Sequence, residues 1–452
     1  MVAKDQLTHT LYVLALLWMA PVILSAQEHE DPGPEMEFSL LRQNDVIALG
    51  EAHTGFYPGI KRIGLGQSHL SFGGSYRGQY EWFQNENFES MPGEDGWWLQ
   101  RGLLHGHFQS DRWQVFGELG YSDVFGKADL APVDVDLLYV NQLFIEYQQG
   151  NWTFGAGREN MRLGTGRLVD PREGPNVRWS FDQVRTAYAN ASFEVLAFYA
   201  IPAFPRADVF DNRTLSDQEQ LWGLYWTQSR NDRGLLFDLY YLGTYYEEQT
   251  YARGVGEETR HSVGARFNLK TDALNFDNEV VYQFGSFGPD NISAWTISFN
   301  VWQQWAPITA GFKTELISGD GGSGSLGTFN PLYPRGAYFG RVARFGPANL
   351  IDFHPYIQYR KGKLFLEVDY DHFWRFSRND GIYDPAMNVV LAGDSPARTI
   401  AGQLGTLAHY ELNTHFAVEL ETNFIFVNDF ISDLVADEQN LFHMVFTTEV
   451  RF

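Results

Sequence analysis

The chain has 452 residues and a formal net charge of −23, from 33 basic and 56 acidic side chains. This acidic balance excludes a nucleic-acid-binding protein, which needs a cationic surface to displace counterions from phosphates. Cysteine is absent, so the chain has no disulfide framework and no thiolate metal site. Aromatic residues reach 16% while charged residues are only 20%, which suits repeated strands with one apolar and one wet face.

The N-terminus has the pattern of a secretory signal peptide. Lys4 precedes an apolar run from Leu11 to Leu24, and the segment Ser25–Gln27 contains the expected cleavage site. The alternative is a single membrane anchor, but the run is shorter than the about 20 residues that a transmembrane helix needs. We therefore predict a signal peptide over 1–26 and a loosely structured periplasmic lead-in over 27–60.

Apolar and polar residues alternate in many segments beyond Leu70. The clearest alternation runs from Leu70 to Trp82, and it recurs at Trp113–Tyr121, His261–Leu269 and Phe416–Phe424. A period of two is typical of strands that are wet on one face only. About eighteen such segments, within a range of 16–18, reach the C-terminus. No later segment resembles a transmembrane helix, and in lipid only helices and closed sheets satisfy every backbone group.

Residues 61–452 are therefore predicted to form one all-β domain, a transmembrane antiparallel up-and-down β-barrel in the bacterial outer membrane. Barrels of this kind join their strands by short periplasmic turns and long extracellular loops, and the links between the predicted strands alternate in the same way. The short links are Gln149–Asn151, Asn190–Ser192, Lys270–Ala273, Arg360–Lys363 and Leu412–Thr414. The long links are Phe83–Gly96, Arg158–Ser180, Pro202–Gln220, Gly319–Leu350 and Arg375–Arg398.

The last segment, Leu441 to Phe452, has the pattern of a closing barrel strand. Its alternate positions Phe442, Met444 and Phe446 are apolar, and the chain ends on an aromatic residue. We expect the barrel-assembly machinery to recognise this strand through its terminal Phe452. The remaining predicted partner of the wall is outer-membrane lipid.

The densest polar segment, 158–185, lies on a long link and holds six arginines and four acids. The arginines are Arg158, Arg162, Arg167, Arg172, Arg178 and Arg185. Arg grips carboxylates at two points, so such a loop, folded inward, would narrow a pore and present guanidinium groups to a passing carboxylate. Asp170, Glu173 and Asp182 would then hold the arginines in place. The alternative is an Arg/acid ladder that braces the wall or fixes the loop, and residue types alone leave both open.

The glycine run Ser318–Ser325 lacks the Gly-Lys-Ser/Thr ending of a phosphate loop and is expected to be a flexible external loop. Asp320 alone cannot hold Ca²⁺, which needs six or more oxygen ligands. Three carboxylates, Glu367, Asp369 and Asp371, share one strand face and are expected to line the lumen. We predict no metal and no cofactor.

Enzymatic interpretations find little support in the sequence. The pair Glu51 and His53 lies in the lead-in without a second histidine at ligand spacing. His105 and His107 alternate on one strand, where no carboxylate is spaced to complete a zinc site. No local Ser/His/Asp grouping stands out, so we expect a protein that is not an enzyme.

The motif Gly166–Arg178, followed by Ser180–Asp182, resembles the signature of the alginate export family. Further similar segments are Ser71–Gly74, Gln79–Glu81, Leu99–Arg101 and Phe329–Gly340, and the resemblance runs from Phe38 to Phe452. The family pattern departs at Trp179, where a second basic residue is expected. The resemblance implies an eighteen-stranded barrel with an Arg-rich constriction for an anionic polysaccharide. It carries over Arg158, Arg167, Arg172, Arg178 and Arg185 as pore residues.

The predicted pore and substrate-binding set is completed by Arg77, Arg101, Arg162, Arg335, Asp170, Glu173 and Asp182. The first hypothesis is a passive diffusion pore for an anionic polysaccharide or a small carboxylated solute. The alternative is an outer-membrane barrel that does not transport, either a structural, adhesin-like protein or a plugged enzyme.

Overall fold

The structure is a computed structural model that describes residues 56–452 except 62, 92, 232, 323 and 414. The predicted signal peptide, the lead-in up to residue 55 and the pair Glu51 and His53 lie outside the described residues. The described end of the lead-in forms helix α2 (Phe56–Lys61), and β1 (Ile63–Leu65) then pairs with the start of the first long strand. Within the described residues, no helix has both the length and the apolar character to cross a membrane.

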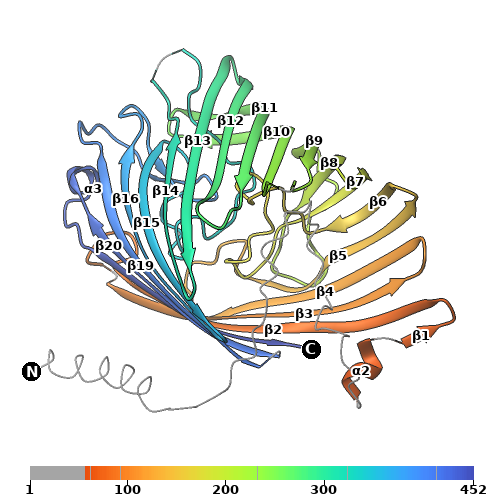
Figure 1. Cartoon of the computed structure of the whole chain (residues 1–452). Coiled ribbons are helices and arrows are strands. Elements are labelled where there is room, and N and C mark those ends of the chain that lie inside the picture. The colour runs from red at the N-terminus through yellow and green to blue at the C-terminus, as the bar shows by residue number, and fades with distance from the viewer. Residues whose placement is uncertain (1–55, 62, 92, 232, 323, 414) are drawn as a thin grey trace, which may run out of the picture. The chain divides into compact units, whose positions relative to one another are not determined.

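The wall is a closed ring of eighteen antiparallel strands, as the sequence predicted. These strands are β2 (Ser68–Gln84), β3 (Glu94–Gln109), β4 (Trp113–Phe125), β5 (Asp136–Gln149), β6 (Trp152–Glu159), β7 (Ser180–Ala189), β8 (Phe193–Ala203), β9 (Glu219–Gln228), β10 (Leu235–Tyr251), β11 (Gly254–Leu269), β12 (Asn275–Phe287), β13 (Asp290–Trp305), β14 (Ile308–Ile317), β15 (Leu350–Lys361), β16 (Leu364–Arg375), β19 (Thr399–Asn413), β20 (Phe416–Val427) and β21 (Leu441–Arg451). Figure 1 follows them in colour from β2 in orange to the blue C-terminal strands.

Each strand pairs with its neighbours in the chain, and β21 closes the ring on β2 in a register that runs from Ser75↔Arg451 to Gln84↔Phe442. Closure leaves no strand edge exposed to lipid. Phe452 adds a last pair of backbone hydrogen bonds with Gly74, each 3.0 Å long. The predicted closing strand is therefore confirmed as part of the wall.

The alternation in the sequence sorts side chains between the two faces of the wall. On β2, Phe72, Tyr76 and Tyr80 are exposed on the outer face, whereas the interleaved Ser75 and Arg77 are buried on the inner face. Strand β12 repeats this pattern. An apolar outer face suits lipid, and a polar inner face suits a lumen.

All five predicted short links are confirmed at one end of the barrel. At the other end most links are long, but two are tight turns, Ala252-Arg253 between β10 and β11 and Gly288-Pro289 between β12 and β13. Here the strands themselves continue further before they turn, since β10 and β11 have 17 and 16 residues. Long loops are thus not required at every extracellular connection.

Two long-end connections contain structure of their own. The link between β16 and β19 forms a small hairpin from β17 (Ile382–Tyr383) and β18 (Val389–Leu391). The link between β20 and β21 contains helix α3 (Asp429–Leu434), whose Phe430 ring lies 3.9 Å below the guanidinium of Arg375. These segments pack against the long-loop end of the ring.

Candidate functional site

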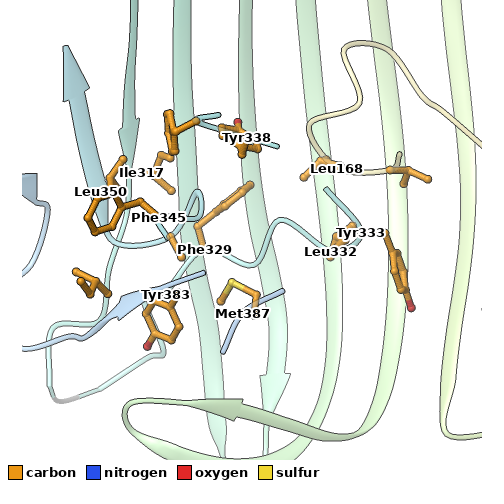
Figure 2. Close-up of a cluster of buried hydrophobic side chains, with 14 of the residues drawn as sticks. Leu168, Ile317, Phe329, Leu332, Tyr333, Tyr338, Phe345, Leu350, Tyr383 and Met387 are labelled. Atoms are coloured by element: carbon orange, nitrogen blue, oxygen red, sulfur yellow. The ribbon is translucent and has the colours of Figure 1, made fainter. Parts of the chain in front are cut away.

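Two long connections fold against the inner face of the wall. They are the first inner loop (160–179), between β6 and β7, and the second inner loop (318–349), between β14 and β15. Both contribute to one buried apolar cluster. Figure 2 shows members of this cluster in front of the strands, with Leu168 from the first inner loop and Phe329, Leu332, Tyr333, Tyr338 and Phe345 from the second.

The two loops are joined through their backbones. The Asp170 amide donates to the Tyr333 carbonyl at 2.8 Å, and the Tyr333 amide donates to the Leu168 carbonyl at 2.9 Å. The loops approach so closely that a Cβ on Gly336 would lie 2.5 Å from Cδ of Pro175. This pairing makes the two loops one unit, in which a movement of either loop involves the other.

The glycine run of the second inner loop is fastened to the rest of the structure at Asp320. Asp320 is 3% exposed, and its carboxylate accepts two hydrogen bonds from Arg253, at 2.7 and 2.6 Å. The backbone amide of Asp320 also donates to Asp380 at 2.7 Å. Asp320 is therefore anchored by an arginine from a different connection, and the flexibility expected of the rest of the run stays a prediction.

Several arginines of the predicted set are paired with carboxylates. Arg158 on β6 grips Asp182, directly opposite on β7, through two hydrogen bonds of 2.8 Å. Arg185 bonds both carboxylate oxygens of Glu159, at 3.1 and 3.2 Å. Arg162 reaches Asp170 at 2.7 Å within the first inner loop. In such pairs the positive charge is neutralised at close range.

Arg167 pins the first inner loop to the wall. Its guanidinium lies 3.0 Å from Glu279 on β12 and 2.6 Å from Glu315 on β14. It also donates to Ser298 at 2.7 Å and to the hydroxyl of Tyr338 in the second inner loop. Arg167 is only 8% exposed, so this network is an internal fastening of both loops.

Arg172 lies between the two loops. Its Nε donates to the carbonyl of Pro334 at 3.2 Å, and its guanidinium lies 5.2 Å from the ring centre of Trp179. Burial lowers the pKa of Arg172 to about 10. The departure from the family pattern at Trp179 therefore supplies an aromatic surface for an arginine.

Four more members of the set form the Glu173 cluster, defined as Arg77, Arg101, Arg178 and Glu173. Arg101 on β3 and Arg178 contact the two Glu173 oxygens at 2.8 and 2.6 Å. Arg77 on β2 donates to the backbone carbonyls of Glu173 and Pro175 at 2.6 and 3.0 Å. Residues distant in the sequence thus meet where the first inner loop touches the wall.

The Glu173 cluster is rich in positive charge. Partial burial raises the pKa of Glu173, but the guanidinium groups of Arg178 and Arg101 outweigh it and hold that pKa below its usual range. Within the described part of the chain, Nε of Arg77, Nη1 of Arg101 and Nε of Arg178 are buried without a hydrogen-bond acceptor. The next carboxylate that acts on Arg178 is Glu118. Three N–H donors near the Glu173 carboxylate therefore have no acceptor among the described residues.

The second inner loop contributes Arg335 and Arg341 to the same region. Arg335 lies 4.7 Å from the ring centre of Tyr338, and its backbone amide donates to the carbonyl of Gly166 at 3.1 Å. Arg341, which the sequence analysis missed, reaches Glu419 at 2.6 Å and Gln79 at 3.0 Å. Its position directly after the family-like stretch that ends at Gly340 was the available signal.

The histidine pair on β3 has polar neighbours on the adjacent strand. His105 is buried, and its Nδ1 lies 3.9 Å from Glu118 on the neighbouring β4. His107 contacts Gln114 at 3.2 Å. Spacing along one strand does not reveal such a cross-strand neighbour, and the expectation that no zinc site is completed at these histidines stays a prediction.

A family comparison agrees with this architecture. The family model described as alginate export matches residues 68–441, which is most of the chain. The chain belongs to the alginate export family. No curated protein matches it. The match covers almost the whole wall together with both inner loops.

Solved structures from Pseudomonas aeruginosa share the fold of this family member. OpdO has a TM-score of 0.58 at 12% identity, covering 85% of this chain and 97% of that chain. The outer membrane protein OpdK has a TM-score of 0.58 at 11% identity, covering 84% and 98%. OpdK with vanillate has a TM-score of 0.59 at 10% identity, with the same coverage of 84% and 98%. Family and fold together make this chain an outer-membrane barrel.

Proposed function

We propose that this protein is a passive outer-membrane pore for anionic solutes and that the Glu173 cluster is its cationic contact point. The observation that carries the proposal is a local charge surplus: Arg101 and Arg178 contact the Glu173 carboxylate, and a third guanidinium, that of Arg77, contacts the backbone carbonyl of the same residue. Membership of the alginate export family supports a channel. The cluster adds a physical reason for the channel to prefer anions, namely a positive potential where a loop meets the wall.

Glu173 occupies the cluster as a solute carboxylate would. Its side chain is 43% exposed, whereas those of Arg101 and Arg178 are 4% and 12% exposed behind it. A passing carboxylate that takes its place gains the same charge-assisted hydrogen bonds. Competition from Glu173 keeps solute binding weak, and weak binding is what conduction requires, since a tightly held solute blocks the path.

The braced arginines have a different role in this proposal. Arg158, Arg167 and Arg185 each have carboxylate partners and are at most lightly exposed. We assign them to holding the first inner loop and its wall strands in place. The proposed constriction is therefore smaller than the whole Arg-rich segment, and solute contact falls mainly to the Glu173 cluster.

The solute class that fits the cluster is a carboxylate, either a polyuronate or a smaller acid. Planar guanidinium groups match carboxylates in geometry as well as charge. The structurally similar OpdK has been solved with vanillate, which is itself a carboxylate. Transport by this route needs no energy input and no chemistry, because the solute follows its own gradient.

The test is the reversal potential of the purified barrel in planar bilayers under a salt gradient. Arg178→Ala should reduce the anion preference severalfold, because it removes a positive charge that contacts Glu173 at 2.6 Å. The matched control is the double variant Arg158→Gln with Asp182→Asn, which removes one braced pair without changing the net charge. An anion preference that survives Arg178→Ala unchanged would retire the cationic contact point.

A second candidate is a barrel that does not conduct. It is favoured by the apolar packing of the inner loops, in which Phe329, Tyr333 and Phe345 are at most 2% exposed. The same bilayer experiment separates the two candidates. Folded wild-type protein that gives no current at any voltage would support the non-conducting barrel.

A further inference from the structure

Three metal-ligating side chains meet on the inner face of the wall, away from the Glu173 cluster. Asp352 and His354 lie on β15 and Asp371 lies on β16, and one possible ligand atom from each lies within 4.8 Å of the other two. The antiparallel register brings them together. Asp352 is paired with Phe373 and Phe353 with His372. Asp371, the next residue along β16, therefore lies beside His354. The exposed fractions of Asp352, His354 and Asp371 are 1%, 8% and 1%.

The polar atoms of this triad are poorly satisfied. Among the described residues, Oδ2 of Asp352, Nε2 of His354 and both carboxylate oxygens of Asp371 are buried without a hydrogen bond. Nδ1 of His354 lies 2.6 Å from Oδ1 of Asp371, close enough for an ion pair. Two buried carboxylates that accept so few hydrogen bonds are costly unless a positive charge lies between them.

We infer that Asp352, His354 and Asp371 bind a divalent transition-metal ion. One imidazole and two carboxylates are a ligand set that suits Zn²⁺ or Mn²⁺, whereas Ca²⁺ prefers a larger set made of oxygens. Two atoms bound at about 2.1 Å to one ion are at most about 4.2 Å apart. Separations up to 4.8 Å therefore need only small side-chain adjustments. The sequence predicted no metal, and this proposal is independent of the proposed solute.

The surroundings fix the triad and leave a route to it. Oδ1 of Asp352 accepts a hydrogen bond from the backbone amide of Glu315, which orients the carboxylate. Glu367 and Asp369 continue along the same face of β16 toward its short-turn end and are only half-buried. This row of carboxylates offers a cation a path from the periplasmic side.

A competing cation on the neighbouring strand is Lys313 of β14. It lies opposite His354 in the strand register, and its ammonium lies 4.6 Å from the ring centre of Tyr356. This cation–π contact with Tyr356 partly stabilises the charge of Lys313. The triad also borders the network that fastens both inner loops. Glu315, whose backbone amide donates to Asp352, contacts Arg167 through its carboxylate at 2.6 Å.

The first test is calorimetric titration of Zn²⁺ into chelator-stripped, detergent-folded barrel, with metal content measured after gel filtration. We expect one ion per chain, and at least about tenfold weaker binding by His354→Ala and by Asp371→Asn. The matched control is His372→Ala, because His372 lies on the outer face of the same strand. Its Zn²⁺ affinity should equal that of the wild type. Retention of one equally tight ion by both triad variants would overturn the inference.

The second test needs no variant and covers the case in which the substitutions prevent folding. X-ray absorption of the zinc-loaded wild-type barrel should show one imidazole nitrogen and oxygen ligands at about 2.0 to 2.2 Å. Folding is checked for every sample by the shift of band position on heating in gel electrophoresis. Wild-type barrel that binds no stoichiometric Zn²⁺ or Mn²⁺, or an absorption spectrum without imidazole, would show that the carboxylates are satisfied by protons or water instead.

Discussion

The sharpest prediction concerns Glu173→Gln, which removes the one carboxylate of the Glu173 cluster but keeps an oxygen that can accept hydrogen bonds. The formal charge of the cluster then rises by one, since Arg77, Arg101 and Arg178 remain. We expect a stronger anion preference. An interpretation in which Glu173 merely fixes the loop predicts no such change.

The magnitude follows from Coulomb's law in a water-filled lumen. A unit charge about 5 Å from a monovalent ion contributes about 0.8 kcal/mol at the dielectric constant of water. Screening at 0.1 M salt, where the Debye length is about 10 Å, reduces this to about 0.5 kcal/mol. Anion occupancy should rise about twofold and cation occupancy should fall by a similar factor, so the permeability ratio should change about fivefold.

The assay is the reversal potential in planar bilayers under a tenfold KCl gradient, first at low and then at high mean salt. The effect of Glu173→Gln should shrink at about 1 M salt, where the Debye length is about 3 Å. Glu248→Gln, at an exposed position near the loop end of β10, removes the same charge elsewhere and should leave the ratio unchanged. A permeability ratio that stays constant in Glu173→Gln, or that moves toward cations, would show that the Glu173 charge does not act on the passing ions.

Two further predictions concern stability and pH. Arg167→Ala leaves the buried Glu279 and Glu315 without their shared guanidinium. The free energy of unfolding, measured with urea in detergent, should therefore fall by about 3–5 kcal/mol. An unchanged free energy of unfolding would show that Arg167 does not fasten the loops. Glu173 has a pKa below its usual 4.5, so the stability that its ionised form contributes is present above that value and is lost as pH falls through the lowered pKa. The difference in anion preference between the wild type and Glu173→Gln should therefore stay constant from pH 7 to about pH 5 and disappear only below about pH 4, and a difference that is already lost near pH 6 would contradict the assignment.

The strands, their faces and the short turns could be predicted from the sequence because they depend on local patterns. Alternation between Phe72, Tyr76 and their polar neighbours decides which side chains meet lipid, whatever the distant chain does. The terminal segment ending in Phe452 likewise carries its own strand pattern. The two tight turns at the long-loop end were missed, because strand length there depends on pairing between neighbouring strands.

The grouping of the polar residues was decided by the tertiary structure. The sequence supplied Arg77, Arg101, Arg178 and Glu173 as charges, but only closure of the wall around the first inner loop brings them within contact. The sequence also left open which arginines are paired with carboxylates and which are in excess over them. Asp182, for example, faces Arg158 only through the register of β6 and β7.

The same limit explains the metal triad. Asp371 could be placed in a row with Glu367 and Asp369 from the period of one strand, but Asp352 and His354 come from the strand beside it. Period two fixes the face on which a side chain lies and says nothing about its position along the neighbouring strand. The sequence therefore determined a barrel wall with an apolar and a polar face, and the three-dimensional register determined which charges meet inside it.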